Sequence, residues 1–198
     1  MILFQGNNPQ EPLQKFKNFY DRAVSLNQRN IQVASISSFC KELKEVDSRY
    51  VNIKFIDNKS FIFFSNYNSN KAKQFLKHDQ VSILFFWDKI NVQIRLKGHI
   101  KKLSPKKNEK YFLNRNIYKN ALAISSNQSK VVKSYSEVIE KYNKTLAEAD
   151  LKKCPQYWGG YIFTPYQYEF WEGHENRLNK RELFSLYEDN WTTSFLEP

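Results

Sequence analysis

Cysteine and histidine are scarce in this sequence, and their spacing excludes several kinds of site. The two cysteines, Cys40 and Cys154, lie far apart, and there is no CxxC pair. A disulfide framework or a cysteine zinc site needs several paired or closely spaced cysteines, so neither is expected, and two isolated thiols suit a reducing cytoplasm. The three histidines, His78, His99 and His174, are also isolated. We therefore expect no metal site.

Long apolar runs, glycine and proline are lacking as well. No segment approaches the ~20 consecutive apolar residues that a membrane span requires. Residues 1–11 contain no basic start followed by an apolar run, so a secretory signal is not expected. Only five glycines and six prolines occur in 198 residues, which argues against a linker-rich or disordered chain. We expect a single globular domain over residues 1–198.

Common catalytic motifs are missing too. The sequence contains no Walker loop, no GxGxxG, no GxSxG and no HExxH motif. These motifs mark P-loop NTPases, dinucleotide-binding folds, α/β-hydrolases and zinc proteases respectively, so none of these classes is expected. No alternation of strands and helices in βαβ units is visible, which also argues against a doubly wound nucleotide-binding fold.

Positive charge is what the sequence has in excess. Lysine and arginine number 31 against 20 aspartates and glutamates, a formal net charge of +11. A basic chain attracts polyanions, so one interpretation is a nucleic-acid-binding β-barrel that uses aromatics such as Phe61, Phe63 and Trp87. Aromatics at alternating strand positions are, however, usually core residues, and the lysines are scattered along the whole chain. The charge equally fits a protein that binds several small phosphates.

Hydrophobic periodicity predicts a mainly β chain with a few helices. Apolar residues at helical spacing predict an N-terminal helix over about 11–28. Further helices are predicted to begin at Ser69, at Ser104 and at Ser129, the last running to about Glu148. Strands are predicted over 31–39, 49–57, 61–65, 81–87, 92–100, 158–164, 168–171, 183–187 and 191–196. This succession favours an antiparallel β-barrel with peripheral helices.

Basic, amide and hydroxyl residues gather near the ends of these predicted strands. Arginine grips a phosphate through two parallel hydrogen bonds, lysine acts as a point charge, and hydroxyls complete the shell. Composition and spacing alone therefore indicate a basic antiparallel β protein suited to a phosphorylated ligand. The residues are Arg49, Lys54, Ser65, Lys71, Gln93, Tyr111, Arg115, Gln128, Ser129, Arg177 and Arg181.

A series of short motifs carries a more specific signal. The N-terminal motifs are 49–54 (RYVNIK), 63–66 (FFSN), 69–72 (SNKA), 84–87 (LFFW), 92–95 (VQIR), 110–112 (KYF) and 125–129 (SSNQS). The C-terminal motifs, which are the most specific, are 158–161 (WGGY), 169–173 (EFWEG), 177–178 (RL), Arg181, Trp191 and 196–198 (LEP). In this order, and over roughly residues 11–198, the set resembles the pyridoxamine 5'-phosphate oxidase family.

The resemblance implies an FMN-binding split barrel that works as a homodimer, with the C-terminal segment, about 155–198, in dimerisation and the active site. It implies oxidation of pyridoxamine or pyridoxine 5'-phosphate to pyridoxal 5'-phosphate, with oxygen as acceptor and hydrogen peroxide as by-product. FMN would supply the redox chemistry, and the protein would supply position and positive charge. No acid–base side chain is required beyond this.

The resemblance also implies roles for single residues. Arg49, Ser65 and Lys71 would hold the FMN phosphate, with Gln128 and Ser129 reaching across from the partner. Other FMN contacts would come from Tyr50, Val51, Asn52, Ile53, Lys54, Phe64, Asn70, Gln93, Trp171 and Arg181, those between 49 and 54 through backbone. The substrate would be bound by Lys54, Tyr111, Arg115, Lys119, Arg177 and Asn179. Arg177 would be the catalytic residue, lying over the substrate ring and orienting the carbon that loses hydride.

Four positions depart from the family pattern. Asn70 replaces a second basic residue beside Lys71, and Asn116 replaces a proline after Arg115. Lys119 replaces a serine that helps to hold the substrate phosphate. Asn179 replaces a histidine on the substrate side. The last two favour an alternative substrate, such as the tricyclic aromatic acid of phenazine-forming relatives, and a non-catalytic carrier of flavin or pyridoxal phosphate is a further alternative.

One spacing predicts a backbone irregularity. Arg49 and Lys54 are five residues apart, so in a regular strand their side chains would point to opposite faces. Both can serve one site only if a bulge intervenes or one of them lies at a strand end. We therefore predict an irregularity between them.

Overall fold

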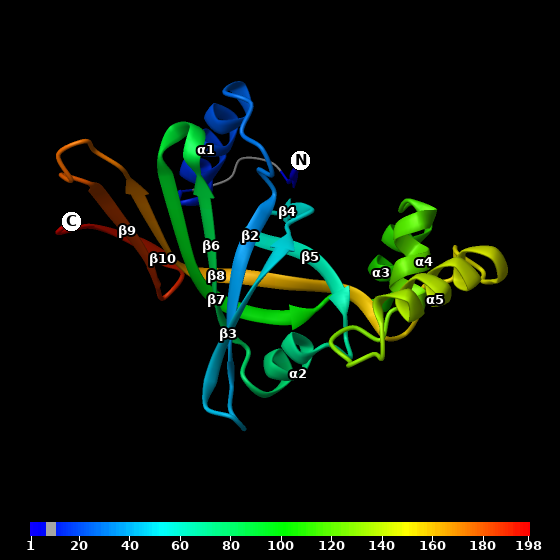
Figure 1. Cartoon of the computed structure of the whole chain (residues 1–198). Helices are drawn as coiled ribbons and strands as arrows, with labels where there is room; N and C mark the ends of the chain where they lie inside the picture. Colours follow the sequence, from blue (N-terminus) through cyan, green and yellow to red (C-terminus); the bar gives the residue numbers. More distant parts are fainter. Residues whose placement is uncertain (7–10) are drawn as a thin grey trace.

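The structure, a computed structural model, describes residues 1–6 and 11–198 (Figure 1). Its strands are β1 (Leu3–Gln5), β2 (Val33–Cys40), β3 (Glu45–Asn52), β4 (Phe55–Asp57), β5 (Ser60–Asn66), β6 (Gln80–Trp87), β7 (Val92–Lys102), β8 (Trp158–Glu172), β9 (Lys180–Tyr187) and β10 (Asn190–Leu196). Its helices are α1 (Leu13–Ser25), α2 (Asn70–Lys77), the short 3-10 helix η1 (Asp88–Ile90), α3 (Pro105–Leu113), α4 (Ile117–Ser125) and α5 (Tyr135–Glu148). None of these helices is both long and apolar enough to cross a bilayer.

The ten strands of the described residues form one sheet. Its order is β1-β4-β5-β8-β7-β6-β2-β3, and β9 and β10 extend it from β8. The pairings are antiparallel except for β1 with β4, which is parallel. Helices α3, α4 and α5 stand together at one end of β8, whereas β9 and β10 lie at the other end (Figure 1). The predicted antiparallel barrel with peripheral helices is confirmed.

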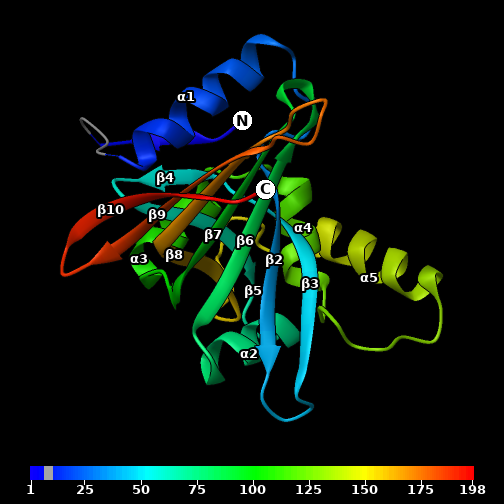
Figure 2. The same ribbon diagram turned by 90° about the vertical axis from the view of Figure 1, so that its left-hand side faces the viewer.

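The core is aromatic, and α1 closes one end of it. Figure 2 shows α1 lying across the sheet. Its Phe16 is fully buried and meets Phe61, Phe85 and Trp87 with ring centroids 5.1, 5.2 and 5.4 Å away. Edge-on contacts of this kind add to the burial of apolar area, which is worth about 1.5–3 kcal/mol for a phenylalanine. The aromatics at alternating strand positions are therefore core residues, as their periodicity indicated.

One predicted break is wrong. The sequence suggests two strands on either side of Pro165, but β8 runs through it without interruption. Proline has no N–H to donate to a ladder, so the strand accommodates it with a register shift opposite Lys97 and Gly98. A Cβ at Gly98 would lie 2.4 Å from the Thr164 carbonyl oxygen, which explains why a glycine occupies this position.

Other boundaries differ from prediction. The helix expected from Ser129 begins only at Tyr135, where Ser134 caps it by accepting a hydrogen bond from the Glu137 N–H at 3.3 Å. Residue Ser129 instead lies in the preceding loop with a φ of 71°. Helix α4 and the short strand β1 have no counterpart among the predicted elements. The strand predicted over 49–57 is divided into β3 and β4.

Candidate functional site

A nearly buried lysine stands at the start of α2. Lys71 is 9% exposed, and its Nζ lies 3.2 Å from Ser65 Oγ, 3.4 Å from Ser69 Oγ and 3.5 Å from Gln128 Oε1. All three partners are neutral, and Lys71 makes no ion pair within the described residues. Burial, aided by the nearby Arg49, lowers the pKa of Lys71 to about 8.

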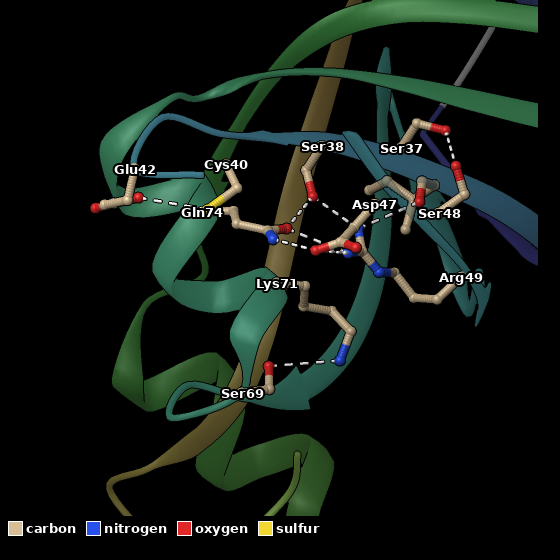
Figure 3. Close-up of polar contacts among 11 residues, drawn as sticks. Ser37, Ser38, Cys40, Glu42, Asp47, Ser48, Arg49, Ser69, Lys71 and Gln74 are labelled. Atoms are coloured by element: carbon tan, nitrogen blue, oxygen red, sulfur yellow. Dashed lines mark hydrogen bonds and ion pairs between the residues drawn. The ribbon is translucent and has the colours of Figure 1, made fainter. Parts of the chain in front are cut away.

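Arg49 approaches the same region from β3 (Figure 3). Its Nη1 donates to Ser38 Oγ at 2.6 Å, and its Nη2 donates to Gln74 Oε1 at 3.2 Å. The carboxylate of Asp47 lies 3.5 Å from Nη2. Burial lowers the pKa of Arg49, whereas Asp47 acts in the opposite direction. Two cations held together with one half-exposed carboxylate form a site that a phosphate would stabilise.

The loop before α5 completes this first site. Gln128 Oε1 accepts a hydrogen bond from Ser65 Oγ at 3.3 Å within the same chain. The loop is held there because Asn66 Nδ2 donates to the Ser126 carbonyl at 3.1 Å. This differs from the expectation that Gln128 reaches the site from a partner. The neighbouring Ser129 is exposed, and no side-chain contact ties it to Lys71.

A break in the backbone places Lys54. The expected irregularity is present as a gap between β3 and β4 rather than as a bulge, because the β2–β3 register has no shift. In this gap the Ile53 N–H donates to the Gln32 carbonyl, and the Lys54 N–H donates to the Ile62 carbonyl beside β5. The chain thus changes its partner strand between these two residues. Lys54 lies past the end of β3, so the direction of its side chain does not follow the strand alternation that determines the direction of Arg49.

Lys54 belongs to a second cationic cluster with Arg115 and Lys119. Burial lowers the pKa of Lys54, and the charges of Lys119 and Arg115 lower it further. Arg115 Nη1 donates to the Lys119 carbonyl at 2.6 Å and to Asn120 Oδ1 at 3.0 Å. None of the three cations makes an ion pair within the described part of the chain. Three unneutralised cations at one place form a second site suited to an anion.

An aromatic stack supports this second cluster. Phe64 lies parallel to Tyr111 with centroids 3.8 Å apart and to Trp158 at 5.2 Å. The Arg115 guanidinium lies 5.0 Å from the Trp158 ring. Burial raises the pKa of Tyr111, so its hydroxyl remains protonated and can donate. Phe64 is therefore a packing surface for Tyr111 and Trp158 as well as the chain neighbour of Ser65.

Three more residues of the expected site are cross-strand neighbours at the far end of β8. Trp171 pairs with Gln93 of β7 and with Arg181 of β9. Arg181 Nε and Nη2 donate to Glu169 Oε1 at 3.0 and 2.9 Å, and Nη1 donates to the Glu197 carbonyl at 2.7 Å. The alternation of residues gave no sign that Glu169 is buried, because it lies on the face opposite Tyr168 and Phe170 and is covered there by ion pairs with Arg95 and Arg181.

Arg177 and Asn179 lie in the turn between β8 and β9. Arg177 is exposed and has a φ of 60°, in the left-handed region. Asn179 Oδ1 accepts a hydrogen bond from the His174 N–H at 3.0 Å, and His174 Nδ1 accepts one from the Asn176 N–H at 3.2 Å. The side chains of Asn179 and His174 thus shape the turn that presents Arg177.

The remaining residues expected to contact FMN differ in which of their atoms are accessible to a ligand. Val51 and Ile53 point into the core, at 8% and 0% exposure, so only their backbone is open to a ligand. Tyr50 and Asn52 are exposed on the opposite face of β3. Asn70, the first residue of α2, is exposed, and its side chain makes no hydrogen bond to Lys71. It therefore does not replace the missing cation.

The residues fall into two groups at opposite ends of one strand. Ser65 pairs with Gly159 and Asn66 with Trp158, so both cationic clusters lie at the beginning of β8. Gln93, Trp171 and Arg181 lie at its end, with Arg177 in the following turn. Thirteen residue-to-residue steps from Trp158 to Trp171 correspond to roughly 40 Å along the strand. Within one chain the two groups are therefore separated by the length of β8.

Comparison with known proteins identifies the family of the chain. A family model described as pyridoxamine 5'-phosphate oxidase matches residues 30–143, and one described as the pyridoxine 5'-phosphate oxidase C-terminal dimerisation region matches residues 158–198. A curated relative from Legionella pneumophila (strain Lens), named pyridoxine/pyridoxamine 5'-phosphate oxidase, is 34% identical over 190 residues, which are 95% of this chain and 88% of the relative.

Two solved structures share the fold. PhzG from Burkholderia lata 383, in complex with tetrahydrophenazine-1-carboxylic acid, has a TM-score of 0.88 at 22% identity, covering 97% of this chain and 95% of its own. A pyridoxamine 5'-phosphate oxidase-related, FMN binding protein from Nostoc punctiforme has a TM-score of 0.79 at 12% identity, covering 96% and 98%. The expected split barrel is thereby confirmed.

Proposed function

Because the chain belongs to the pyridoxamine 5'-phosphate oxidase family, whose members are FMN-dependent oxidoreductases, we propose that it oxidises pyridoxine or pyridoxamine 5'-phosphate to pyridoxal 5'-phosphate. Oxygen takes up two electrons and two protons and leaves as hydrogen peroxide. With pyridoxamine 5'-phosphate as substrate, water hydrolyses the resulting imine and the amino nitrogen leaves as ammonia. The observation that carries this proposal is the second cationic cluster, Lys54, Arg115 and Lys119, with no carboxylate paired to it in the described residues.

The first cluster fits the cofactor. Lys71 is a nearly buried cation without a charged partner in the described residues, and its depressed pKa reports the cost of that burial. Arg49, Ser65, Lys71 and Gln128 would hold the FMN phosphate, and the backbone between Arg49 and Lys54 would line the flavin. When bound, FMN supplies the redox chemistry by accepting two electrons from the substrate and passing them to oxygen.

The second cluster fits the phosphate of the substrate. Lys54, Arg115 and Lys119 would bind its oxygens, and the protonated Tyr111 would donate a hydrogen bond. Lys119 gives this site one more cation than the family pattern provides. A doubly charged phosphate gains more from three cations than a singly charged carboxylate does. This favours a B6 phosphate over an aromatic acid, the alternative substrate.

Lys119→Ser, which restores the family residue, should raise KM for pyridoxine 5'-phosphate about fivefold, since one exposed charge contributes about 1 kcal/mol at most. The value of kcat should not change, because Lys119 would contact only the phosphate. Steady-state kinetics at fixed ionic strength measure both constants. The control is Lys144→Ser, the same change of charge on the exposed side of α5. An unchanged or lower KM for Lys119→Ser would exclude this lysine from the phosphate site.

We propose that the active unit is a homodimer with composite sites. The two groups of residues lie at opposite ends of β8, so each is incomplete alone. A twofold axis would place Gln93, Trp171, Arg177 and Arg181 of one subunit beside the phosphate clusters of the other, and would generate two equal sites. The match of residues 158–198 to a C-terminal dimerisation region supports this arrangement.

The domain organisation and the compartment are also part of the proposal. We propose one domain over residues 1–198, supported by a main core cluster that extends from Ile2 to Phe184. The two cysteines, Cys40 and Cys154, are free thiols. Unpaired thiols are compatible with a reducing cytoplasm, and we propose that compartment.

The proposal is tested by the visible spectrum of the FMN-loaded protein under anaerobic conditions. Pyridoxine 5'-phosphate should bleach the flavin absorbance, and admission of oxygen should restore it. Pyridoxine, which lacks the phosphate, should bleach it far more slowly at the same concentration. Bleaching by a phenazine precursor but not by pyridoxine 5'-phosphate would assign the alternative substrate. A protein that binds FMN but is bleached by neither compound would be a carrier instead.

A further inference from the structure

A buried glutamine links α2 to Arg49. Gln74 is 5% exposed, and its Oε1 accepts hydrogen bonds from Ser38 Oγ at 2.6 Å and from Arg49 Nη2 at 3.2 Å. Its Nε2 donates to the carboxylate of Asp47. Ser38, itself 2% exposed, also accepts a hydrogen bond from Arg49 Nη1 at 2.6 Å. Figure 3 shows the four side chains joined in this network.

The network holds the two terminal nitrogens of the guanidinium. Within the described residues, every hydrogen bond of Arg49 uses Nη1 or Nη2, which leaves its Nε–H for a ligand. A free arginine side chain samples many rotamers, and fixing it before the ligand arrives removes that entropic cost from binding. Ser38 and Gln74 are neutral, so they restrain the arginine without neutralising its charge.

Helix geometry connects this network to the lysine. Gln74 follows Lys71 by three residues on α2, a spacing that places both side chains on one face of the helix. Both are buried. Arg49 and Lys71 repel each other while no anion is present. A flexible arginine would move away from Lys71 or toward Asp47. The amide of Gln74 opposes these movements because it contacts both the Arg49 guanidinium and the Asp47 carboxylate.

We propose that Ser38 and Gln74 are positioning residues, which hold the Arg49 guanidinium next to Lys71 so that the two cations receive one phosphate. This inference rests on the proposed function, which assigns that phosphate to FMN. The role differs from direct binding, because neither Ser38 nor Gln74 needs to touch the ligand. It also gives α2 two tasks, since one helix carries a phosphate-binding cation and the amide that orients the other cation.

Gln74→Leu should weaken FMN binding to the apoprotein about tenfold, as expected when a charge-assisted contact loses its geometry. Riboflavin, which has the same ring but no phosphate, should bind with unchanged affinity. Fluorescence titration of each ligand gives the two dissociation constants. The control is Gln80→Leu, the same replacement at an exposed glutamine on β6, which should alter neither constant.

A double-mutant cycle with Arg49→Ala separates positioning from general structure. If Gln74 acts through Arg49, then Gln74→Leu should have no further effect on FMN affinity once Arg49 is alanine. An equal loss in both backgrounds, or an equal loss for riboflavin, would overturn the inference and leave the FMN site intact. If Arg49→Ala alone leaves FMN affinity unchanged, the assignment of the phosphate site is wrong. Ser38→Ala, which removes only a hydroxyl, repeats the cycle if Gln74→Leu does not fold, with the same outcomes.

Discussion

Arg177→Ala should lower kcat for pyridoxine 5'-phosphate about a hundredfold, because misplacement of a reacting carbon costs roughly that factor. FMN affinity should stay within about twofold, since exposed positions away from packing have small effects. Arg177 is exposed, and its side chain makes no hydrogen bond or ion pair in the described part of the chain. We therefore expect Arg177 to orient the substrate rather than to hold the turn.

The conformation of the turn is not a confounding factor for this variant. At a φ of 60° alanine meets the same steric cost as arginine, since both carry a Cβ. Single-turnover reduction of bound flavin measures the step directly and separates it from product release. Asn176→Ala, an exposed neighbour in the same turn, should react at the unmutated rate. A rate for Arg177→Ala equal to that of the unmutated protein would remove Arg177 from the catalytic assignment.

Lys71→Met should weaken FMN binding tenfold to a hundredfold, since one charge-assisted hydrogen bond is worth about 1.5–3 kcal/mol. The apoprotein should lose no stability, and it can gain some, because methionine removes a buried cation that has only neutral partners. Fluorescence titration gives the affinity, and thermal unfolding of the apoprotein gives the stability. Lys77→Met, the same change at an exposed position of α2, should leave FMN affinity unchanged. Tight FMN binding by Lys71→Met would contradict the phosphate assignment.

The pH dependence of FMN binding provides a second readout for Lys71. Its pKa in the apoprotein is about 8, so the lysine is charged below that pH and neutral above it. A bound phosphate favours the charged form and raises this pKa, so binding takes up a proton above pH 8. FMN affinity should therefore fall as pH rises through 8 in the unmutated protein, and this fall should be absent in Lys71→Met.

Mixing the two variants tests whether the sites are composite. Refolding an equal mixture of Arg177→Ala and Lys71→Met chains gives a dimer population of which about half are mixed dimers. If each site takes Lys71 from one subunit and Arg177 from the other, every mixed dimer contains one intact site. The mixture should then regain about a quarter of the unmutated activity. Recovery no greater than the mean of the two separate variants would show that both residues serve a site within one chain.

Local patterns in the sequence determined much of the fold in advance. Alternation in 92–100 predicts β7, and the Ser104–Pro105 pair predicts the start of α3, because both signals depend on neighbouring residues only. Helix α4 escaped prediction because its buried Ala123 belongs to a cluster with Phe112 and Trp158, and that contact is formed only in the folded chain. The spacing of Arg49 and Lys54 correctly indicated an irregular backbone, but whether it would be a bulge or a change of partner strand depended on distant β5.

The site residues, too, could be predicted only where the signal lies in the local sequence. The cations and hydroxyls are visible in the sequence as chemical types, and the structure brings Ser65, Lys71 and Gln128 within hydrogen-bonding distance. Ser38 and Gln74 gave no such signal. A serine on a strand and a glutamine on a helix are ordinary exposed residues until tertiary packing buries them against each other. Residues such as Ser38 and Gln74, which contact a ligand-binding side chain rather than the ligand, are brought into place by tertiary packing, and a short sequence motif does not encode that packing.

The register shift beside Gly98 has a consequence for the whole C-terminal third of the chain. Before it, odd-numbered residues of β8 such as Tyr161 and Phe163 enter the core, and after it even-numbered residues such as Tyr168 and Phe170 do. The bulge therefore inverts the parity of the strand. Strict alternation from Phe163 without the bulge would place Trp171 in the core and Phe170 on the opposite face, so this irregularity, which contains Pro165, determines which of the two aromatic rings is buried.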